Sequence, residues 1–259
     1  MTTLSIDAHL IYDLAAPASL LMQVEVAEIA GQVIRDADLR TSATDTFRRI
    51  PAEAALGTRT WIHAEDRFEA TYRAEVEITR PDPNLATLSA TPTADLTAEA
   101  TSFLMPSRYC QSDLFQPFVA SEFEGLAGGP LAEAIRGWVH DNFAYVPGIS
   151  DARTTAMDSF LARQGICRDY AHVVVAMARA GGLPARCASV YAPDVEPPDF
   201  HAVAEIWLDG AWHLVDATGM AHASDIAVVG VGRDAAEISF LTVMGMATFV
   251  EQSVSVTRR

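Results

Sequence analysis

Apolar and polar positions alternate at short period through the first hundred residues of the chain. The clearest stretches are LSIDAHLIYDL (4–14), SLLMQVEVA (19–27) and RFEATYRAEVEIT (67–79). Turn-forming residues separate them, among them Gly31, Gly57 and the segment Pro81–Asn84. Alternation with period two is typical of β-strands, and strands at this spacing without long helical patterns between them favour a small sandwich. We therefore expect residues 1–100 to form a β-rich N-terminal domain without catalytic residues.

Helical spacing replaces this alternation further along the chain. The segment 130–143 carries apolar residues at helical period and begins with Pro130, which suits the first position of a helix. A second, short helix is expected at Thr155, where Asp158 completes a capping box. A third helix is predicted between Gly165 and Gly181.

The C-terminal half then returns to strands. Three runs lie at 185–192, 201–208 and 211–218, and two more lie in the tail at 225–232 and 248–256. A helical layer followed by an antiparallel sheet is an α+β pattern. We predict an α+β fold in which the N-terminal β-sandwich domain (1–100) is followed by a catalytic domain (101–259) with a helical layer packed on an antiparallel sheet.

Composition and charge narrow the function classes. The chain has 259 residues, 18 basic residues that are all arginine, 34 acidic residues, and a net charge of −16. Half of the residues are hydrophobic, which excludes a disordered chain. The acid excess argues against nucleic acid or an anionic membrane as the partner, because both attract basic surfaces.

The compartment is predicted from cysteine usage and hydropathy. The three cysteines are too few and too odd in number for a disulfide framework, so we expect reduced thiols and a cytoplasmic protein. No uncharged apolar run approaches the roughly 20 residues that a membrane helix needs. Asp7 and Asp13 stand where a signal peptide would be apolar.

Cys167 is the candidate nucleophile. It lies two residues after Gly165, at the start of the third predicted helix. A helix N-terminus carries partial positive charge and free N–H groups, which favour a thiolate and stabilise an oxyanion that forms beside it. Cys110 and Cys187 are expected to be inert, because free cysteines usually behave as small buried hydrophobes.

A thiol needs a base to become a thiolate, and a predicted hairpin supplies a histidine with an acidic partner. His201 opens the first strand of this hairpin, and Asp209–Gly210 is a strong signal for a two-residue turn. Such a turn places Val203 opposite Asp216, so that His201 and Asp216 share a face as diagonal neighbours about 7–8 Å apart at the backbone. Asp216 would then orient the imidazole. His172 and His213 fall on other faces and are expected to be structural.

No metal or cofactor site is predicted. Zinc sites need close pairs of Cys or His residues, and neither C-x-x-C nor H-x-x-x-H occurs. Asp194, Glu196 and Asp199 lack the glycine and terminal glutamate of a calcium loop, so we expect a solvated rim loop there. No phosphate-binding or dinucleotide-binding glycine motif is present.

Two linked segments resemble the transglutaminase-like superfamily. GICRDYAHVVVAMARAGGLPAR and HAVAEIWLDGAWHLVDAT are similar to its core motifs G-V-C-x-D-[YF]-A-H, G-[IL]-P-A-R, H-A-W-x-E and G-W-x-x-x-D-[PA]-T, in order, over residues 125–220. PSRYCQSD and VGRDAAEISF resemble the bacterial two-domain branch, which has a β-rich N-terminal domain. The resemblance implies a papain-like arrangement with Cys167 as nucleophile, His201 as general base and Asp216 as orienting acid.

The chain departs from the family pattern at two positions. Val203 and Cys187 stand where aromatic residues are common, and we expect both to line or underlie the cleft and to leave it more open to water. Tyr145 and Gln164 are the candidates for the second oxyanion donor.

The resemblance implies a cysteine-nucleophile amide hydrolase, a peptidase or amidase that acts on a peptide or protein amide through a thioester and needs no cofactor. The absence of lysine and the expected open cleft favour hydrolysis. The alternatives are a protein-glutamine acyltransferase, a non-catalytic interaction protein on the same fold, and an enzyme that acts on a carrier-tethered small amide. The sequence gives no indication of an oligomeric state.

Overall fold

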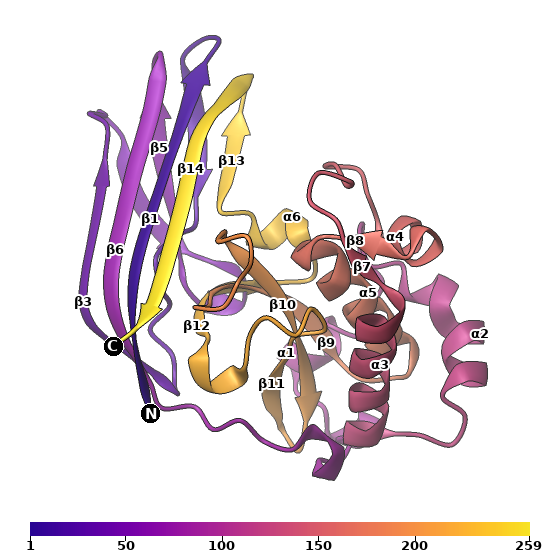
Figure 1. Cartoon of the computed structure of the whole chain (residues 1–259). Helices are drawn as coiled ribbons and strands as arrows, with labels where there is room; N and C mark the ends of the chain where they lie inside the picture. Colours follow the sequence, from indigo (N-terminus) through magenta and orange to yellow (C-terminus); the bar gives the residue numbers. More distant parts are fainter.

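The computed structural model describes all 259 residues, and its N-terminal part is a sandwich of two antiparallel sheets (Figure 1). Its strands are β1 (Thr2–Leu14), β2 (Ala18–Met22), β3 (Gln32–Thr41), β4 (Phe47–Pro51), β5 (Thr58–Ala64), β6 (Arg67–Ile78), β13 (Leu241–Met244) and β14 (Ala247–Arg258). One sheet has the order β14-β1-β6-β3, and the other has the order β13-β2-β5-β4. The predicted sandwich is present.

Alternation along β1 shows why the sandwich forms. Leu4, Ile6, Ala8 and Leu10 are buried between the two sheets, and the residues between them are more exposed. Because successive side chains of a strand point to opposite faces, this register places every second residue in the core.

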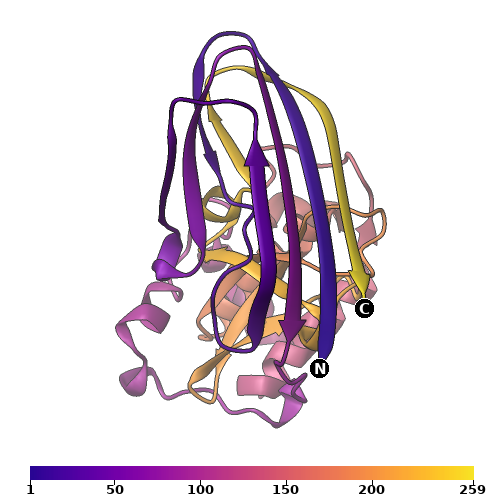
Figure 2. The same ribbon diagram turned by 90° about the vertical axis from the view of Figure 1, so that its left-hand side faces the viewer.

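The C-terminal strands complete the sandwich. β14 pairs with β1 along its length, from Leu4 opposite Arg258 to Leu14 opposite Ala247, and β13 pairs with β2. The two chain ends therefore lie side by side, as Figure 2 shows. The sequence-based division assigned all of residues 101–259 to the catalytic part. The last two strands instead pair with strands of residues 1–78. Alternation of apolar and polar residues predicts a strand but does not predict its pairing partner.

The second part of the chain is an α+β core, as predicted. Its sheet has the order β11-β10-β9-β12 and is antiparallel. The strands are β9 (Ala185–Tyr191), β10 (His201–Leu208), β11 (Ala211–Val215) and β12 (Ala227–Gly232). The α-helices are α1 (Ala98–Ser102), α2 (Ser112–Glu122), α3 (Gly128–Asn142), α4 (Ala156–Ala162), α5 (Cys167–Ala180) and α6 (Ala235–Ile238). A small parallel pair, β7 (Ala144–Tyr145) with β8 (Gln164–Gly165), and four 3₁₀ turns at 53–55, 85–87, 93–95 and 223–225 complete the chain.

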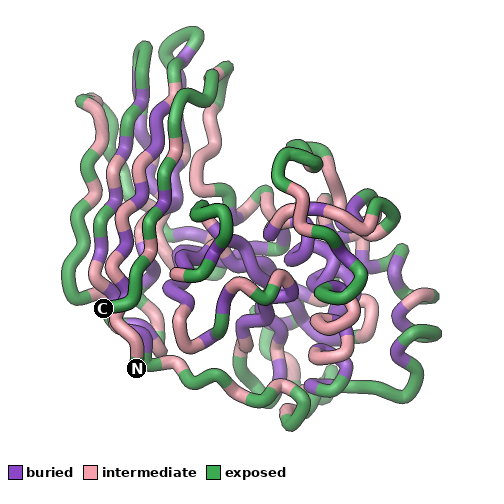
Figure 3. The backbone as a smooth tube through the Cα atoms, viewed as in Figure 1, coloured by how far each residue is buried: buried purple, intermediate pink, exposed green.

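Helix α5 is the centre of this core. All of its residues except Arg168 and Ala180 are buried, between the sheet on one side and α2, α3 and α4 on the other (Figure 3). A helix that is buried on all sides must be apolar nearly all round, as the VVVAMA run of α5 is. The predicted helix between Gly165 and Gly181 is confirmed. None of the helices is long and apolar enough to cross a membrane.

The helix predicted from Pro130 begins two residues earlier. Gly128 has a positive φ of 59°, and a Cβ on Gly129 would lie 1.8 Å from the carbonyl oxygen of Leu85. The two glycines therefore allow α3 to start in close contact with the 85–88 turn. The segment 101–128, for which no helix is predicted, contains the whole of α2.

Buried hydrogen bonds tie the sandwich to the core sheet. Gln32 donates to the carbonyl oxygens of Ala27 (2.7 Å) and Val228 (2.9 Å), and its Oε1 accepts the N–H of Val228 (2.9 Å). The hydroxyl of Tyr191 on β9 donates to the carbonyl oxygen of Val24 (2.9 Å). Since buried polar groups are costly when unpaired, these contacts fix the relative position of the two parts.

We expect Gln32→Ala to destabilise the protein by about 3 kcal/mol, because it leaves the N–H of Val228 and the carbonyl oxygen of Ala27 buried without partners and removes one of the two hydrogen bonds to the carbonyl oxygen of Val228. Urea unfolding followed by circular dichroism measures the change. Gln116→Ala removes an exposed glutamine from α2 and should change the free energy of unfolding by less than about 0.5 kcal/mol. Equal effects of the two substitutions would contradict the role of Gln32.

Candidate active site

Cys167 is the first residue of α5. Ile166 before it is extended, with φ −110° and ψ 179°, and donates its N–H to the carboxylate of Asp169 (2.9 Å). A Cβ on Gly165 would lie 2.6 Å from the Cβ of Asp169, so only glycine allows this close turn into the helix. Cys167 therefore lies at the N-terminus of α5, where its own backbone N–H has no partner within the helix and can donate to a reacting carbonyl oxygen.

The β10–β11 hairpin has the predicted register. Leu208 pairs with Ala211 across the two-residue turn Asp209–Gly210, whose residues both have positive φ, as a type I′ turn requires. His201 is the first residue of β10, and Asp216 directly follows β11. The hairpin brings His201 Nε2 to 3.0 Å from Asp216 Oδ2, and both side chains are almost fully buried.

Asp216 is held on both oxygens. Thr218 donates its backbone N–H (2.8 Å) and its hydroxyl (2.7 Å) to Oδ1, and Ala221 donates its N–H to Oδ2 (2.9 Å). Burial raises the pKa of Asp216, but hydrogen bonds from His201 and Thr218 outweigh burial and hold the pKa below its ordinary value. The carboxylate is therefore fixed and ionised. Thr218 stands at the last position of the quoted D-A-T motif, although its contacts could not be derived from spacing.

The charge on His201 is stabilised from two sides. Burial lowers its pKa, but the hydrogen bond with Asp216 and the interaction with Cys167 outweigh burial and raise the pKa to about 10. Nε2 is bonded to Asp216, and Nδ1 has no other hydrogen-bond partner, which leaves Nδ1 to the Cys167 sulfur. The three residues singled out from the sequence are therefore together, and the geometry suits a thiolate–imidazolium pair.

Tyr145 lies beside the thiol, whereas Gln164 does not line the cavity. The parallel β7–β8 pair places Tyr145 opposite Gly165, two residues before Cys167. Burial and the adjacent charge of Cys167 raise the pKa of Tyr145, so its hydroxyl keeps its proton. A protonated hydroxyl at this place can donate to an oxyanion, together with the backbone N–H of Cys167.

A cavity of about 420 Å³ opens over Cys167 and His201. Its walls come from the core, from the α6 segment and from the sandwich, which contributes Gln23 and Leu241. Phe200 and Phe240 stack in it with ring centroids 4.4 Å apart. The cavity is mostly apolar and adjoins the candidate nucleophile, which is typical of a substrate site.

Val203 and Cys187 do not line this cavity. Both are almost completely buried, Val203 in an apolar cluster with Leu214 and Val228, and Cys187 against α5. The expectation that these two positions open the cleft to water is therefore wrong. The position of a residue in a sequence motif predicts its place on a strand. It does not predict which residues of other elements pack against its side chain.

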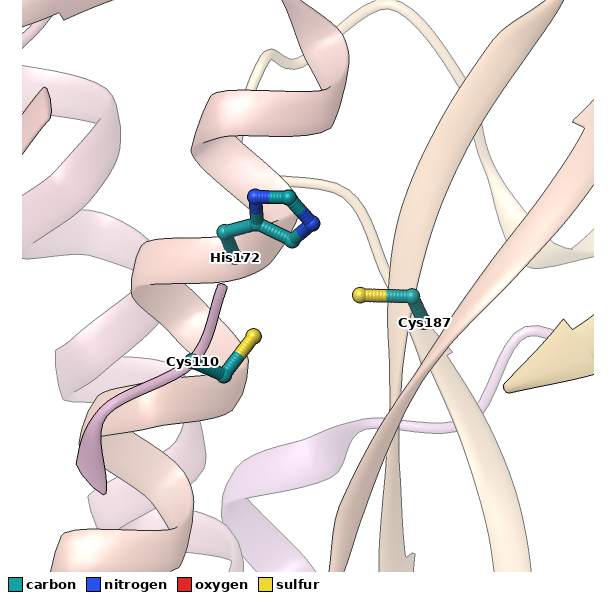
Figure 4. Close-up of side chains that lie close together, drawn as sticks. All are labelled: Cys110, His172 and Cys187. Carbon is teal, nitrogen blue, oxygen red and sulfur yellow. The ribbon is translucent and has the colours of Figure 1, made fainter. Parts of the chain in front are cut away.

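Cys110, His172 and Cys187 form a second group of chemically capable side chains, shown in Figure 4. Their ligand atoms all lie within 4.8 Å of one another, and all three residues are buried. His172 Nε2 accepts the N–H of Ala235 (3.1 Å), so its lone pair is engaged. Burial lowers the pKa of His172 to about 4. The hydrogen bond with Cys110 and, second to it, burial raise the pKa of Cys187. His172 and Cys187 are therefore uncharged in this buried group, although two thiols and an imidazole are the donor types of zinc sites.

The acidic rim loop does not gather into a cation site. Asp194 pairs with Arg258 of β14 (2.8 Å), while Asp199 lines the cavity. The sequence did not single out Asp199 as a cleft residue, because its place depends on the course of the loop between β9 and β10.

Comparisons with known proteins agree with this geometry. A family model described as the transglutaminase-like superfamily matches residues 125–217. A solved structure from Cytophaga hutchinsonii, described as a candidate cysteine protease, has a TM-score of 0.91 and 28% identity and covers 99% of this chain and 90% of its own.

Two curated relatives are uncharacterised proteins. One from Mycobacterium leprae is 26% identical over 111 residues, which are 39% of this chain and 39% of that protein. One from Mycobacterium tuberculosis is 29% identical over 145 residues, 49% of this chain and 46% of its own. The match spans less than half the length of these curated relatives.

We expect Cys167 to be the fastest thiol in alkylation, because it opens into the cavity while Cys110 and Cys187 are fully buried. Iodoacetamide labelling at neutral pH, quenched at intervals and mapped by mass spectrometry, gives the three rates. Labelling of Cys110 or Cys187 at the rate of Cys167 would show that the nucleophile is misassigned.

We also expect a pH signature of the His201–Asp216 pair. The pKa of His201 is raised from about 6.5 to about 10, so the folded chain keeps a proton that the unfolded chain loses in that range. The pair's contribution to stability is therefore full below about pH 6.5 and is lost as the pH rises toward 10.

Urea unfolding at several pH values tests this expectation. The free energy of unfolding of the wild type should fall more steeply with rising pH than that of Asp216→Asn. Asp82→Asn, which removes an exposed carboxylate 3.9 Å from His222, should follow the wild type. The same slope in Asp216→Asn and the wild type would show that the pair is not charged.

Proposed function

Residues 125–217 match the transglutaminase-like superfamily, and we propose that the chain is a cysteine-nucleophile amide hydrolase, a peptidase or amidase that acts through a thioester. The observation that carries the proposal is the His201–Asp216 pair at 3.0 Å, whose second ring nitrogen is left to Cys167 at the mouth of a cavity. Cysteine-dependent chemistry is what this superfamily and the Cytophaga relative have in common.

The first half-reaction cleaves the amide. The Cys167 thiolate attacks the carbonyl carbon, and the C–O electron pair moves onto oxygen, where the N–H of Cys167 and the hydroxyl of Tyr145 donate to it. When the tetrahedral intermediate collapses, the C–N bond breaks and the His201 imidazolium gives its proton to the leaving nitrogen. The products are a free amine and a thioester on Cys167.

The second half-reaction releases the acid. Neutral His201 takes a proton from water as its oxygen attacks the thioester, and the C–S bond then breaks to regenerate the thiolate and the imidazolium. Asp216 keeps the imidazole in one orientation and stabilises its positive form throughout. Every proton and electron pair is carried by Cys167, His201, substrate or water, so the proposed mechanism uses no metal or cofactor.

Hydrolysis is proposed ahead of acyl transfer because the relative that matches almost the whole chain is described as a candidate cysteine protease. The same thioester could instead be resolved by an amine, which is the acyltransferase alternative. The proposed substrate is a peptide or protein amide, and the proposed compartment is the cytoplasm, where the three free thiols would stay reduced.

The test is to incubate the protein with a glutamine-containing peptide library and a labelled primary amine. We expect new peptide termini or free ammonia without incorporation of the label. Cys167→Ala and His201→Ala should abolish release, and Asp216→Asn should slow it roughly 10²–10⁴-fold, as expected when the imidazole loses its orienting charge. His213→Ala and Cys187→Ala are the matched controls and should retain activity, and a chelator should leave the rate unchanged.

Two outcomes would overturn the proposal. Efficient incorporation of the amine that depends on Cys167 would show that the protein is an acyltransferase. Product release that persists in Cys167→Ala would show that another group carries the reaction.

A further inference from the structure

An acidic side chain lines the same cavity as the candidate nucleophile. Asp199 is an exposed residue of the loop between β9 and β10, two residues before His201, and borders the cavity together with Phe200 and Phe240. Its charge reaches residues on both sides of the cleft, because it adds to the burial that raises the pKa of Tyr145 in the core and of Tyr12 in the sandwich.

The carboxylate is fixed through one oxygen only. Oδ1 accepts the backbone N–H of Phe200 (2.7 Å) and the side-chain amide of Gln252 on β14. Oδ2 accepts no hydrogen bond from the chain, although a carboxylate oxygen has room for two. The sandwich therefore holds Asp199 in one orientation and leaves one oxygen free to bind a ligand.

Three other carboxylates, at the site and in the same loop, each form an ion pair with a basic side chain. Asp169 pairs with Arg168 (3.1 Å), Asp216 pairs with His201 (3.0 Å), and Asp194 pairs with Arg258. Asp199 makes no ion pair. Burial raises the pKa of Asp199 by more than the hydrogen bonds from Phe200 and Gln252 and the nearby charge of His201 lower it, so the ionised carboxylate is only partly compensated. A cation brought by a ligand would relieve this cost.

The apolar surface beside Asp199 favours a ligand that also has an aliphatic part. Phe200 stacks on Phe240, and Leu241 continues the same wall, so the carboxylate lies at the side of an apolar slot. An aliphatic chain that ends in a positive group matches such a slot, because its methylenes cover the aromatic rings while its head reaches the carboxylate.

We propose that Asp199 is the residue that selects the substrate, by binding the ammonium or guanidinium group of a peptide whose scissile amide lies at Cys167. This inference rests on the proposed function, and it adds a substrate class to it: peptides with a lysine or arginine side chain beside the cleaved amide. A free α-amino group presents the same charge without the aliphatic stem, and the experiment distinguishes the two sources.

The first measurement does not need turnover. Cys167 is alkylated with 2-bromoethylamine, which is cationic, and with 2-bromoethanol, which is its neutral counterpart, and the two rates are expressed as a ratio. We expect Asp199→Asn to lower this ratio about tenfold, the effect of losing one charged hydrogen bond, and to leave the rate with the neutral reagent unchanged. Asp45→Asn is the charge-matched control, because Asp45 is exposed and makes no ion pair in the β3–β4 loop.

The second measurement uses matched peptides. N-acetylated peptides with arginine or its neutral counterpart citrulline test the side chain, and peptides with a free or acetylated α-amine test the chain end. We expect the wild type to prefer arginine about tenfold or more in kcat/KM and Asp199→Asn to lose that preference. A preference confined to the free α-amine would overturn the side-chain assignment.

The two proposals fail in different ways. If no peptide is turned over but the alkylation ratio still falls in Asp199→Asn, the hydrolase proposal fails and the cation site stands. If peptides are hydrolysed through Cys167 and neither ratio differs between the wild type and Asp199→Asn, the cation site is wrong and the hydrolase stands. A fall of the ratio in Asp45→Asn equal to that in Asp199→Asn would also overturn the cation site, because net charge alone would then explain the preference.

Discussion

The buried pair between His201 and Asp216 is the constraint on which the site depends. An ionised carboxylate is stable in the interior only if its oxygens are paired, and Asp216 has partners on both oxygens from His201, Thr218 and Ala221. The hairpin must therefore keep its register and the chain after β11 must turn back toward Asp216. A shift of one residue in the hairpin would place either His201 or Asp216 on the wrong face.

The sandwich belongs to the same arrangement. It is tied to the core sheet through Gln32 and Tyr191, it supplies part of the cavity wall, and its last strand holds Asp199 through Gln252. The cavity therefore lies where the two parts of the chain meet. A cleft built in this way can change its specificity through the sandwich and keep the chemistry of the core unchanged.

Local signals were sufficient for the elements that carry the chemistry. The Asp209–Gly210 turn fixed the register of the hairpin, and the glycines around α5 marked its ends, so the places of Cys167, His201 and Asp216 followed from short-range patterns and from the motifs that they share with a known family. These features depend on residues close in the sequence, of which the most distant are His201 and Asp216, 15 positions apart.

Long-range features did not follow from the sequence. The pairing of β14 with β1 joins residues 233 to 254 positions apart. The packing of Val203 and the approach of Cys110 to Cys187 also depend on segments distant in the chain. Asp199 lies in an exposed loop, as expected, but nothing in its neighbours along the sequence reveals that this loop borders the cavity. A pattern of residue types predicts the strand or helix in which each residue lies. The contacts named above depend on how whole elements pack against one another.

The most direct test of the account is to trap the acyl-enzyme. A peptide ester or amide that the protein cleaves is mixed with it, and the reaction is quenched in acid. The intact mass of the protein is measured before peptide mapping. The account predicts an added mass equal to the acyl group, located on Cys167, removed by hydroxylamine as a thioester is, and absent in Cys167→Ala. Substrate turnover without any adduct on Cys167, or an adduct on another residue that persists in Cys167→Ala, would contradict it.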